Sequence, residues 1–214
     1  MENFAVLLNE NLDILKEIGS IGMGHATTSL AQMLNMKVTM TIPTVNIMSL
    51  AEACDYLKTR RQSTIGVMIR LQGDSKGMIL QLLSREFALH VINYFFQTDE
   101  TELGELDEMS LSVVQEIGNI TSGAYCNSLA SMTGLFIDIS TPTHCMDLDE
   151  SYGFAQGRSE KECAIIINNS FFAGEEKVTS DFLFMPDETT TKMVLEKLKE
   201  YYGFTVPMTE DTTA

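Results

Sequence analysis

Apolar side chains recur at intervals of three and four in two long segments of the chain, residues 12–35 and 108–133. This spacing separates an apolar face from a polar one and predicts an amphipathic helix in each segment. The apolar positions that can face a core are Ile14, Ile18 and Ile21 in the first helix and Val113, Ile117 and Ile120 in the second.

Strands are predicted after each of these helices. Alternating apolar residues in "KVTMTIPTV" and "FIDISTP" indicate strands with one buried face. "STIGVMIRLQG" and "KGMILQLL" flank a Gly-Asp turn, and "CAIIINNSF" and "KVTSDFLFM" flank a turn around Gly174, so each pair predicts two neighbouring strands. Each half then ends in a helix behind a capping residue, Ser84 or Asp187, and Gly203 is expected to cap the end of the last helix.

Residues 17–43 come into register with a segment of the second half, without a gap, when they are shifted by 99 positions. Glu17-Ile18-Gly19 then aligns with Glu116-Ile117-Gly118. An internal repeat of this kind predicts two copies of one structural unit. Further matches pair Ile21 with Ile120, Gly24 with Gly123, Ser29-Leu30-Ala31 with Ser128-Leu129-Ala130, Met33 with Met132, and Pro43 with Pro142.

Two copies of this unit predict an α/β fold in a single domain. We expect two pseudo-two-fold-related repeats, a sheet of about six strands flanked by helices, and two long helices that carry the candidate site. Repeat one is predicted at about residues 8–98 and repeat two at about 106–204, with the acidic connector "QTDETELGELDE" between them. Residues 205–214 are expected to be a flexible tail.

A polar stripe runs along the second long helix. Ser112, Glu116 and Asn119 are spaced by four and three residues, which places them within about 60° of one another around the helix axis. The glutamate can accept a strong hydrogen bond from a partner's Lys or Arg. The equivalent positions of the first helix are Asp13, Glu17 and Ser20.

The carboxamide of Asn119 can hold a water by one donor and one acceptor. A glutamine orients water in this way for phosphoryl hydrolysis in GTPases, where positioning supplies most of the catalysis. The hydroxyl of Ser20 is about two bonds shorter and cannot reach as far. An exposed Glu and Asn are also typical of a helix face that is only solvated, and the residues alone leave a phosphatase and a docking face open.

The two helices contain several glycines, each of which costs about 1 kcal/mol relative to Ala in a helix interior. Such a cost indicates close approach of another backbone, either from the sheet or from a partner. The glycines are Gly19, Gly22, Gly24, Gly118 and Gly123.

The charge balance is strongly acidic, since fourteen Lys and Arg against thirty Asp and Glu give 14 − 30 = −16. Nucleic acids and anionic membranes require clustered basic residues, and the nearest such cluster is Arg60-Arg61, so neither partner is expected. No apolar run approaches the roughly 20 residues of a membrane span. The N-terminus lacks the basic and apolar regions of a signal peptide, and we expect a cytoplasmic protein.

The cysteines and histidines do not predict a metal or redox site. The cysteines lack C-x-x-C spacing, which favours buried or half-buried thiols, and the histidines are scattered. No P-loop motif is present, so we expect no cofactor of the protein's own. The residues concerned are Cys54, Cys126, Cys145 and Cys163, and His25, His90 and His144.

The polar stripes resemble the signature of the chemotaxis phosphatase family of CheC, CheX and FliY. That signature is Asp or Ser, three residues, Glu, two residues, Asn, then 22 residues and Pro. The second copy satisfies it with Ser112, Glu116, Asn119 and Pro142, whereas the first copy, Asp13, Glu17, Ser20 and Pro43, lacks the Asn. Two copies within about 200 residues most resemble the CheC members of the family.

The resemblance implies a phosphatase that hydrolyses the aspartyl phosphate of the response regulator CheY. Asn119 would orient the attacking water, Glu116 would pair with a regulator Lys, and Ser112 and Pro142 would shape the helix and its neighbour. The Mg²⁺ would belong to the regulator, and CheD, a receptor-modifying deamidase, would be a second partner. One active site is expected, in the second copy, and two internal copies make a monomer sufficient.

Two other classes of function remain possible. A non-catalytic adaptor would bind CheD or the phosphorylated regulator, and the missing Asn at Ser20 would be a step toward that role. A structural part of the flagellar switch is less favoured, since that role in the family comes with additional domains.

Overall fold

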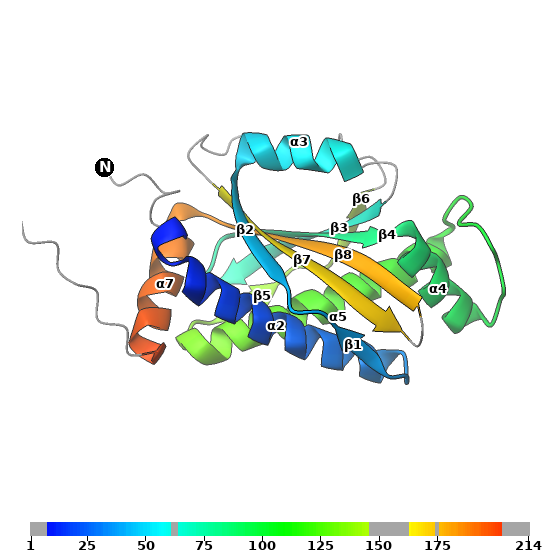
Figure 1. Cartoon of the computed structure of the whole chain (residues 1–214), viewed down its shortest axis with the longest axis horizontal. Coiled ribbons are helices and arrows are strands. Elements are labelled where there is room, and N and C mark those ends of the chain that lie inside the picture. Colours follow the sequence, from blue (N-terminus) through cyan, green and yellow to red (C-terminus); the bar gives the residue numbers. More distant parts are fainter. Residues whose placement is uncertain (1–7, 61–63, 146–162, 174–175, 203–214) are drawn as a thin grey trace, which may run out of the picture.

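The protein forms one antiparallel sheet with helices on both faces (Figure 1). The computed structural model describes residues 8–60, 64–145, 163–173 and 176–202. The helices are α2 (Leu12–Met33), α3 (Leu50–Arg60), α4 (Arg85–Phe96), α5 (Glu108–Thr133) and α7 (Glu188–Tyr202). The strands are β1 (Val38–Met40), β2 (Thr44–Ser49), β3 (Thr64–Gly73), β4 (Gly77–Ser84), β5 (Ile137–Ile139), β6 (Thr143–Cys145), β7 (Cys163–Ala173) and β8 (Glu176–Pro186).

The order of the strands is symmetric. The main path runs β1-β7-β8-β4-β3-β5, and it reads the same from the other end when each strand is replaced by its counterpart in the other half. Strand β2 also pairs with β7, and β6 pairs with β3. The expected number of about six strands fits the main path but is too low for the sheet, which has eight strands in the described residues.

Helices cover the two faces of the sheet unequally. Helices α2 and α5 lie side by side on one face, with α4 and α7 beside them, and α3 crosses the opposite face (Figure 1). On β4, Ile79 and Leu83 join the core beneath α2 and α5, whereas Leu80 and Leu82 join a second core beneath α3. Burial on both faces explains why β4 is apolar at successive positions, and the α/β fold is confirmed.

The long helices follow their predicted ranges, since 12–35 is observed as Leu12–Met33 and 108–133 as Glu108–Thr133. Capping residues set the ends of α5. The Ser110 N–H donates to Asp107 Oδ1 over 2.8 Å, and Gly134 ends the helix in a left-handed conformation with φ 70°. The bond from Ser110 holds the pKa of the Asp107 carboxyl below its usual value.

Both predicted N-caps, Ser84 and Asp187, are confirmed. Ser84 Oγ accepts a hydrogen bond from the Phe87 N–H over 3.2 Å at the start of α4. Asp187 Oδ1 accepts one from the Thr190 N–H over 2.7 Å at the start of α7. The expected turn around Gly174, the expected cap at Gly203 and the expected tail at 205–214 lie outside the described residues.

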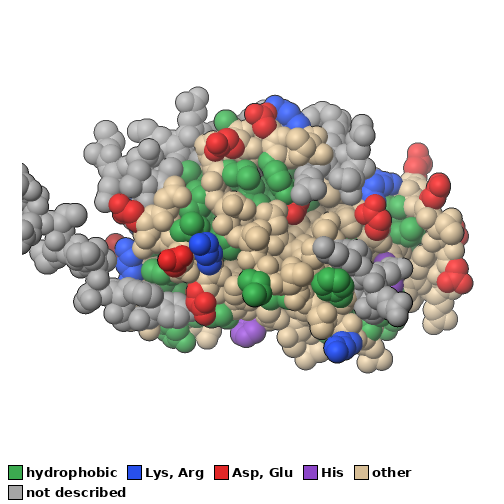
Figure 2. Space-filling view, in the orientation of Figure 1, with side chains coloured by type: hydrophobic (Ala, Val, Ile, Leu, Met, Phe, Trp, Pro, Cys, Tyr) green, Lys and Arg blue, Asp and Glu red, His purple; other side chains and the backbone are tan. Residues whose placement is uncertain are grey.

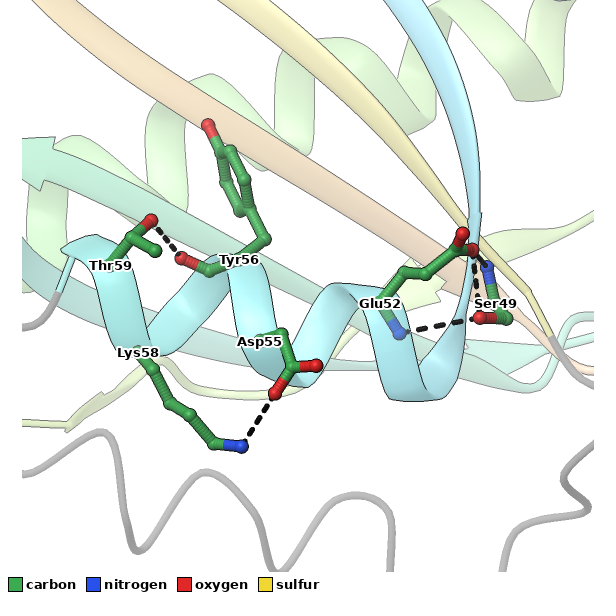
Figure 3. Close-up of polar contacts among 6 residues, drawn as sticks. All are labelled: Ser49, Glu52, Asp55, Tyr56, Lys58 and Thr59. Atoms are coloured by element: carbon green, nitrogen blue, oxygen red, sulfur yellow. Dashed lines mark hydrogen bonds and ion pairs between the residues drawn. The ribbon is translucent and has the colours of Figure 1, made fainter.

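Helix α3 is an element that the hydrophobic pattern does not predict. It begins with a reciprocal capping box, which Figure 3 shows at the end of β2. The Ser49 N–H donates to Glu52 Oε2 over 2.8 Å, and the Glu52 N–H donates to Ser49 Oγ over 3.3 Å. An ion pair of 2.6 Å between Lys58 and Asp55 adds support along the exposed side of the helix.

Two of the helix glycines allow close packing. A Cβ on Gly22 would lie 2.4 Å from Cδ2 of the buried Tyr125, at the contact between α2 and α5. A Cβ on Gly118 would lie 2.4 Å from Cγ1 of Val67 on β3. The expected close approach is therefore present, but it is made to side chains rather than to another backbone.

On the face in Figure 2, acidic side chains are scattered, and basic side chains are fewer and separated. None of the helices in the described ranges is long and apolar enough to span a bilayer.

Candidate functional site

The polar stripe of α5 lines a surface pocket. Ser112, Glu116 and Asn119 form part of one wall, and the segment that ends at Pro142 forms the other. The pocket has a volume of about 320 Å³. The structure therefore brings together all four residues of the second predicted site, although 22 residues separate Asn119 from Pro142.

Hydrogen bonds to the sheet hold both walls of the pocket. On the α5 side, the buried Thr121 hydroxyl donates to Gln81 Oε1 of β4 over 2.7 Å. On the other side, the Ser140 N–H donates to the Arg70 carbonyl over 2.9 Å, and the Arg70 N–H donates to Ser140 Oγ over 3.0 Å. The pocket is thus fixed between two elements that are anchored independently.

The two side chains with candidate chemistry are available to a partner. Glu116 is exposed and Asn119 is half-buried. Within the described residues, neither side chain has a hydrogen-bond or ion-pair partner. Two groups therefore lie one helical turn apart beside the same pocket. The carboxylate can accept a hydrogen bond from a cation, and the carboxamide can orient a water.

The first copy of the motif has a different environment. Asp13 and Glu17 are exposed on α2, and Ser20 is half-buried. Pro43, between β1 and β2, is buried, whereas its counterpart Pro142 is half-buried. The structure thus places the two polar stripes on equivalent helices but does not give them equivalent surroundings.

Several pocket residues were not predicted from the sequence. Gln115 precedes Asn119 by one helical turn and could have been identified by its spacing of four. Its Nε2 lies 3.3 Å from Nδ1 of His144, which is exposed on β6. The other unpredicted lining residues, Ile139, Ser140 and Thr141, reach the pocket only because β5 pairs with β3.

Of the remaining histidines and cysteines, none lines this pocket in the described part of the chain. His25 Nδ1 lies 2.7 Å from Ser128 Oγ, at the contact between α2 and α5. In the described ranges, no three His, Cys, Asp or Glu side chains gather as a metal site requires. Cys126 is buried, as expected, and burial raises the pKa of its thiol to about 12.

The model of the CheC-like family matches residues 10–47 and 109–146 of this chain. The two matched segments are offset by 99 positions at both ends and contain the two motif copies. CheY-P phosphatase CheC of Bacillus subtilis is 30% identical over 197 residues, which cover 87% of this chain and 93% of the relative. The chain belongs to the CheC-like family.

Solved structures of related proteins share the fold. FliY of Thermotoga maritima superposes with a TM-score of 0.71 at 22% identity, covering 90% of this chain and 97% of that one. A chain of the CheX-CheY-BeF3-Mg²⁺ complex of Borrelia burgdorferi gives 0.52 at 18% identity, covering 78% and 96%. The mixed α/β architecture of this CheC-like protein is therefore shared across FliY and CheX-type domains.

Proposed function

We propose that this CheC-like protein hydrolyses the aspartyl phosphate of the response regulator CheY. The observation that carries the proposal is the shared pocket of Ser112, Glu116, Asn119 and Pro142. Membership of a family whose relatives include named CheY-P phosphatases supports the same activity.

In the proposed reaction, the carboxamide of Asn119 aims the attacking water. Its N–H can donate to the water oxygen, and its carbonyl can accept a water hydrogen, so the water is held in one direction. The water oxygen forms a bond to phosphorus as the bond from phosphorus to the aspartyl oxygen breaks. The electron pair leaves with the regulator's carboxylate, and the water's proton passes to the phosphate or to solvent. Such a reaction depends mainly on positioning.

Glu116 is proposed to dock the regulator. It is the only charged side chain among the residues that line the pocket within the described part of the chain. A regulator Lys could donate to its carboxylate, and a charge-assisted bond of this kind fixes the register of two surfaces. Glu116 therefore acts on binding in the proposal, whereas Asn119 acts on the reacting water.

The proposal gives this chain no cofactor of its own. The Mg²⁺ is assigned to the regulator, where it would neutralise charge on the phosphoryl oxygens. A precedent for a partner complex that contains Mg²⁺ is the solved complex of CheX with CheY, BeF3 and Mg²⁺. We also propose that the protein works in the cytoplasm as a monomer and that CheD is a second partner.

The first copy is proposed to be a degenerate site. Glu17 is exposed and could still dock a regulator, but Ser20 lacks the reach and the second hydrogen-bonding atom of a carboxamide. We therefore assign catalysis to the second copy alone.

The experiment that tests this function measures the loss of phosphate from phosphorylated CheY, with and without the protein. The proposal expects dephosphorylation to be faster than the regulator's own rate. Calorimetric titration with CheD and with the phosphorylated regulator identifies the alternative. Binding without faster dephosphorylation would support the adaptor, which the missing Asn in the first copy favours.

A further inference from the structure

The carboxamide of Gln115 lies next to the proposed catalytic one. Gln115 and Asn119 are four residues apart on α5, and both line the pocket. Side chains on a helix lean toward its N-terminus, so that of Asn119 lies over the turn that carries Gln115. Side-chain amides at this spacing can form hydrogen bonds with each other.

A bond between these two amides would compete with water. Asn119 has one carbonyl oxygen and one amide nitrogen with which to hold the water in a fixed direction. If Gln115 occupied either group, Asn119 would lose one of its two contacts with the water. Gln115 lies one helical turn from Asn119 and can therefore prevent the Asn119 carboxamide from orienting the water.

In the structure, Gln115 is turned toward β6 instead. Its Nε2 donates to Nδ1 of His144 over 3.3 Å, and the Asn119 side chain has no partner in the described part of the chain. An amide nitrogen only donates, so this contact requires a tautomer of the His144 ring that has no proton on Nδ1. The contact joins the two walls of the pocket and occupies the Gln115 amide.

The first copy lacks both members of this pair. The position equivalent to Gln115 is Lys16, whose Nζ lies 3.4 Å from Asp13 Oδ1. The position equivalent to His144 is Val45, which is buried and packs against Gly19. The pair of Gln115 and His144 is thus present only in the copy whose motif contains the Asn.

We propose that His144 is a positioning residue that holds Gln115 away from Asn119 and so keeps the Asn119 carboxamide available to the attacking water. This inference rests on the proposed function for its effect on rate. The pairing that it describes can also be observed in the free protein, without any reaction.

The test is a double-mutant cycle with His144→Val, which introduces the first copy's residue, and Gln115→Met, which keeps the length but removes the amide. In the wild-type background, His144→Val is expected to lower kcat by roughly 2- to 10-fold, the effect of one neutral hydrogen bond, with KM little changed. In the Gln115→Met background, His144→Val is expected to have no effect on kcat. An equal loss in both backgrounds, or no loss in either, would overturn the proposal.

A second readout separates this inference from the proposed function. The side-chain amide resonances of Asn119, followed by ¹⁵N NMR, should shift in His144→Val and return in the double variant. If the Asn119 resonances shift in this way but the wild type has no phosphatase activity, the proposed function is overturned and the pairing is supported. Unchanged Asn119 resonances in His144→Val would overturn the pairing even if the protein is an active phosphatase.

Discussion

Gln81 and Phe182 pair across the middle of the sheet, on β4 and β8, and the registers of the other strand pairs make them each other's counterparts in the two halves of the chain. The pseudo-two-fold axis therefore passes between them. An axis at this place puts α2 and α5 in equivalent positions. Ser20 and Asn119 thus differ in their side chains while lying at equivalent points of the fold.

Because the first copy lacks a carboxamide, we predict that Ser20→Ala changes the rate of CheY-P dephosphorylation by less than about two-fold. Removing a hydroxyl that cannot hold water in two directions should have little effect on positioning. Steady-state phosphate release measures this effect. A large loss in Ser20→Ala would mean that the first copy contributes to catalysis.

Glu116→Gln should raise KM by roughly tenfold or more while leaving kcat closer to the wild-type value. Hydrogen bonds to charged groups contribute about 1.5–3 kcal/mol, and this one is proposed to form with the regulator's Lys. Glu105→Gln is the matched control, because Glu105 is exposed in the connector and does not line the pocket. Equal changes in both variants would indicate a general charge effect, which added salt screens, rather than a specific pair.

Gly22→Ala and Gly24→Ala should shift stability in opposite directions. A Cβ on Gly22 would lie 2.4 Å from the ring of buried Tyr125, so overpacking should cost about 1–3 kcal/mol. A Cβ on Gly24 would have its nearest contact at 4.0 Å, to Met40, so the gain in helix propensity of up to about 1 kcal/mol should remain. Urea denaturation gives both values, and a stabilised Gly22→Ala would contradict the packing of α2 on α5.

The start of α5 should be sensitive to acid through Asp107. The bond from the Ser110 N–H lowers the folded-state pKa of this carboxyl. Its stabilising contribution is therefore present above the unfolded-state value of about 3.9 and is lost as the pH falls through the lower folded-state value. Asp107→Asn keeps a capping side chain but does not titrate, so its melting temperature should fall less between pH 5 and pH 3. Identical pH profiles for the two proteins would show that Asp107 is not a cap in solution.

The long helices, the N-caps of α4 and α7 and the strand pairs were predictable because local signals define them. The spacing of Ser112, Glu116 and Asn119 also predicted one face of α5 correctly. For the opposite wall of the pocket, the sequence predicted only one residue, the distant Pro142. Ile139, Ser140 and Thr141 reach it through the pairing of β5 with β3, a long-range contact that no local pattern encodes.

Two features that were not predicted, helix α3 and the position of Gln115, do have signals in the sequence. Ser49 and Glu52 have the spacing of a capping box, which marks the start of α3 even though the helix lacks a strong apolar stripe. Gln115 lies one turn before Asn119 and could have been placed beside it. The contact of Gln115 with His144 could not have been predicted, because it depends on how β6 pairs with β3.

The central claim, that Asn119 completes the only active site, is tested most directly by phosphate release from phosphorylated CheY with the wild type and with Asn119→Ala. Loss of the group that orients the water should slow dephosphorylation by about 100-fold or more, the order expected when a reacting group is misplaced by about 1 Å. Binding of the phosphorylated regulator, measured in parallel by calorimetry, should persist because Glu116 is intact. An Asn119→Ala variant that dephosphorylates the regulator at nearly the wild-type rate would contradict the account.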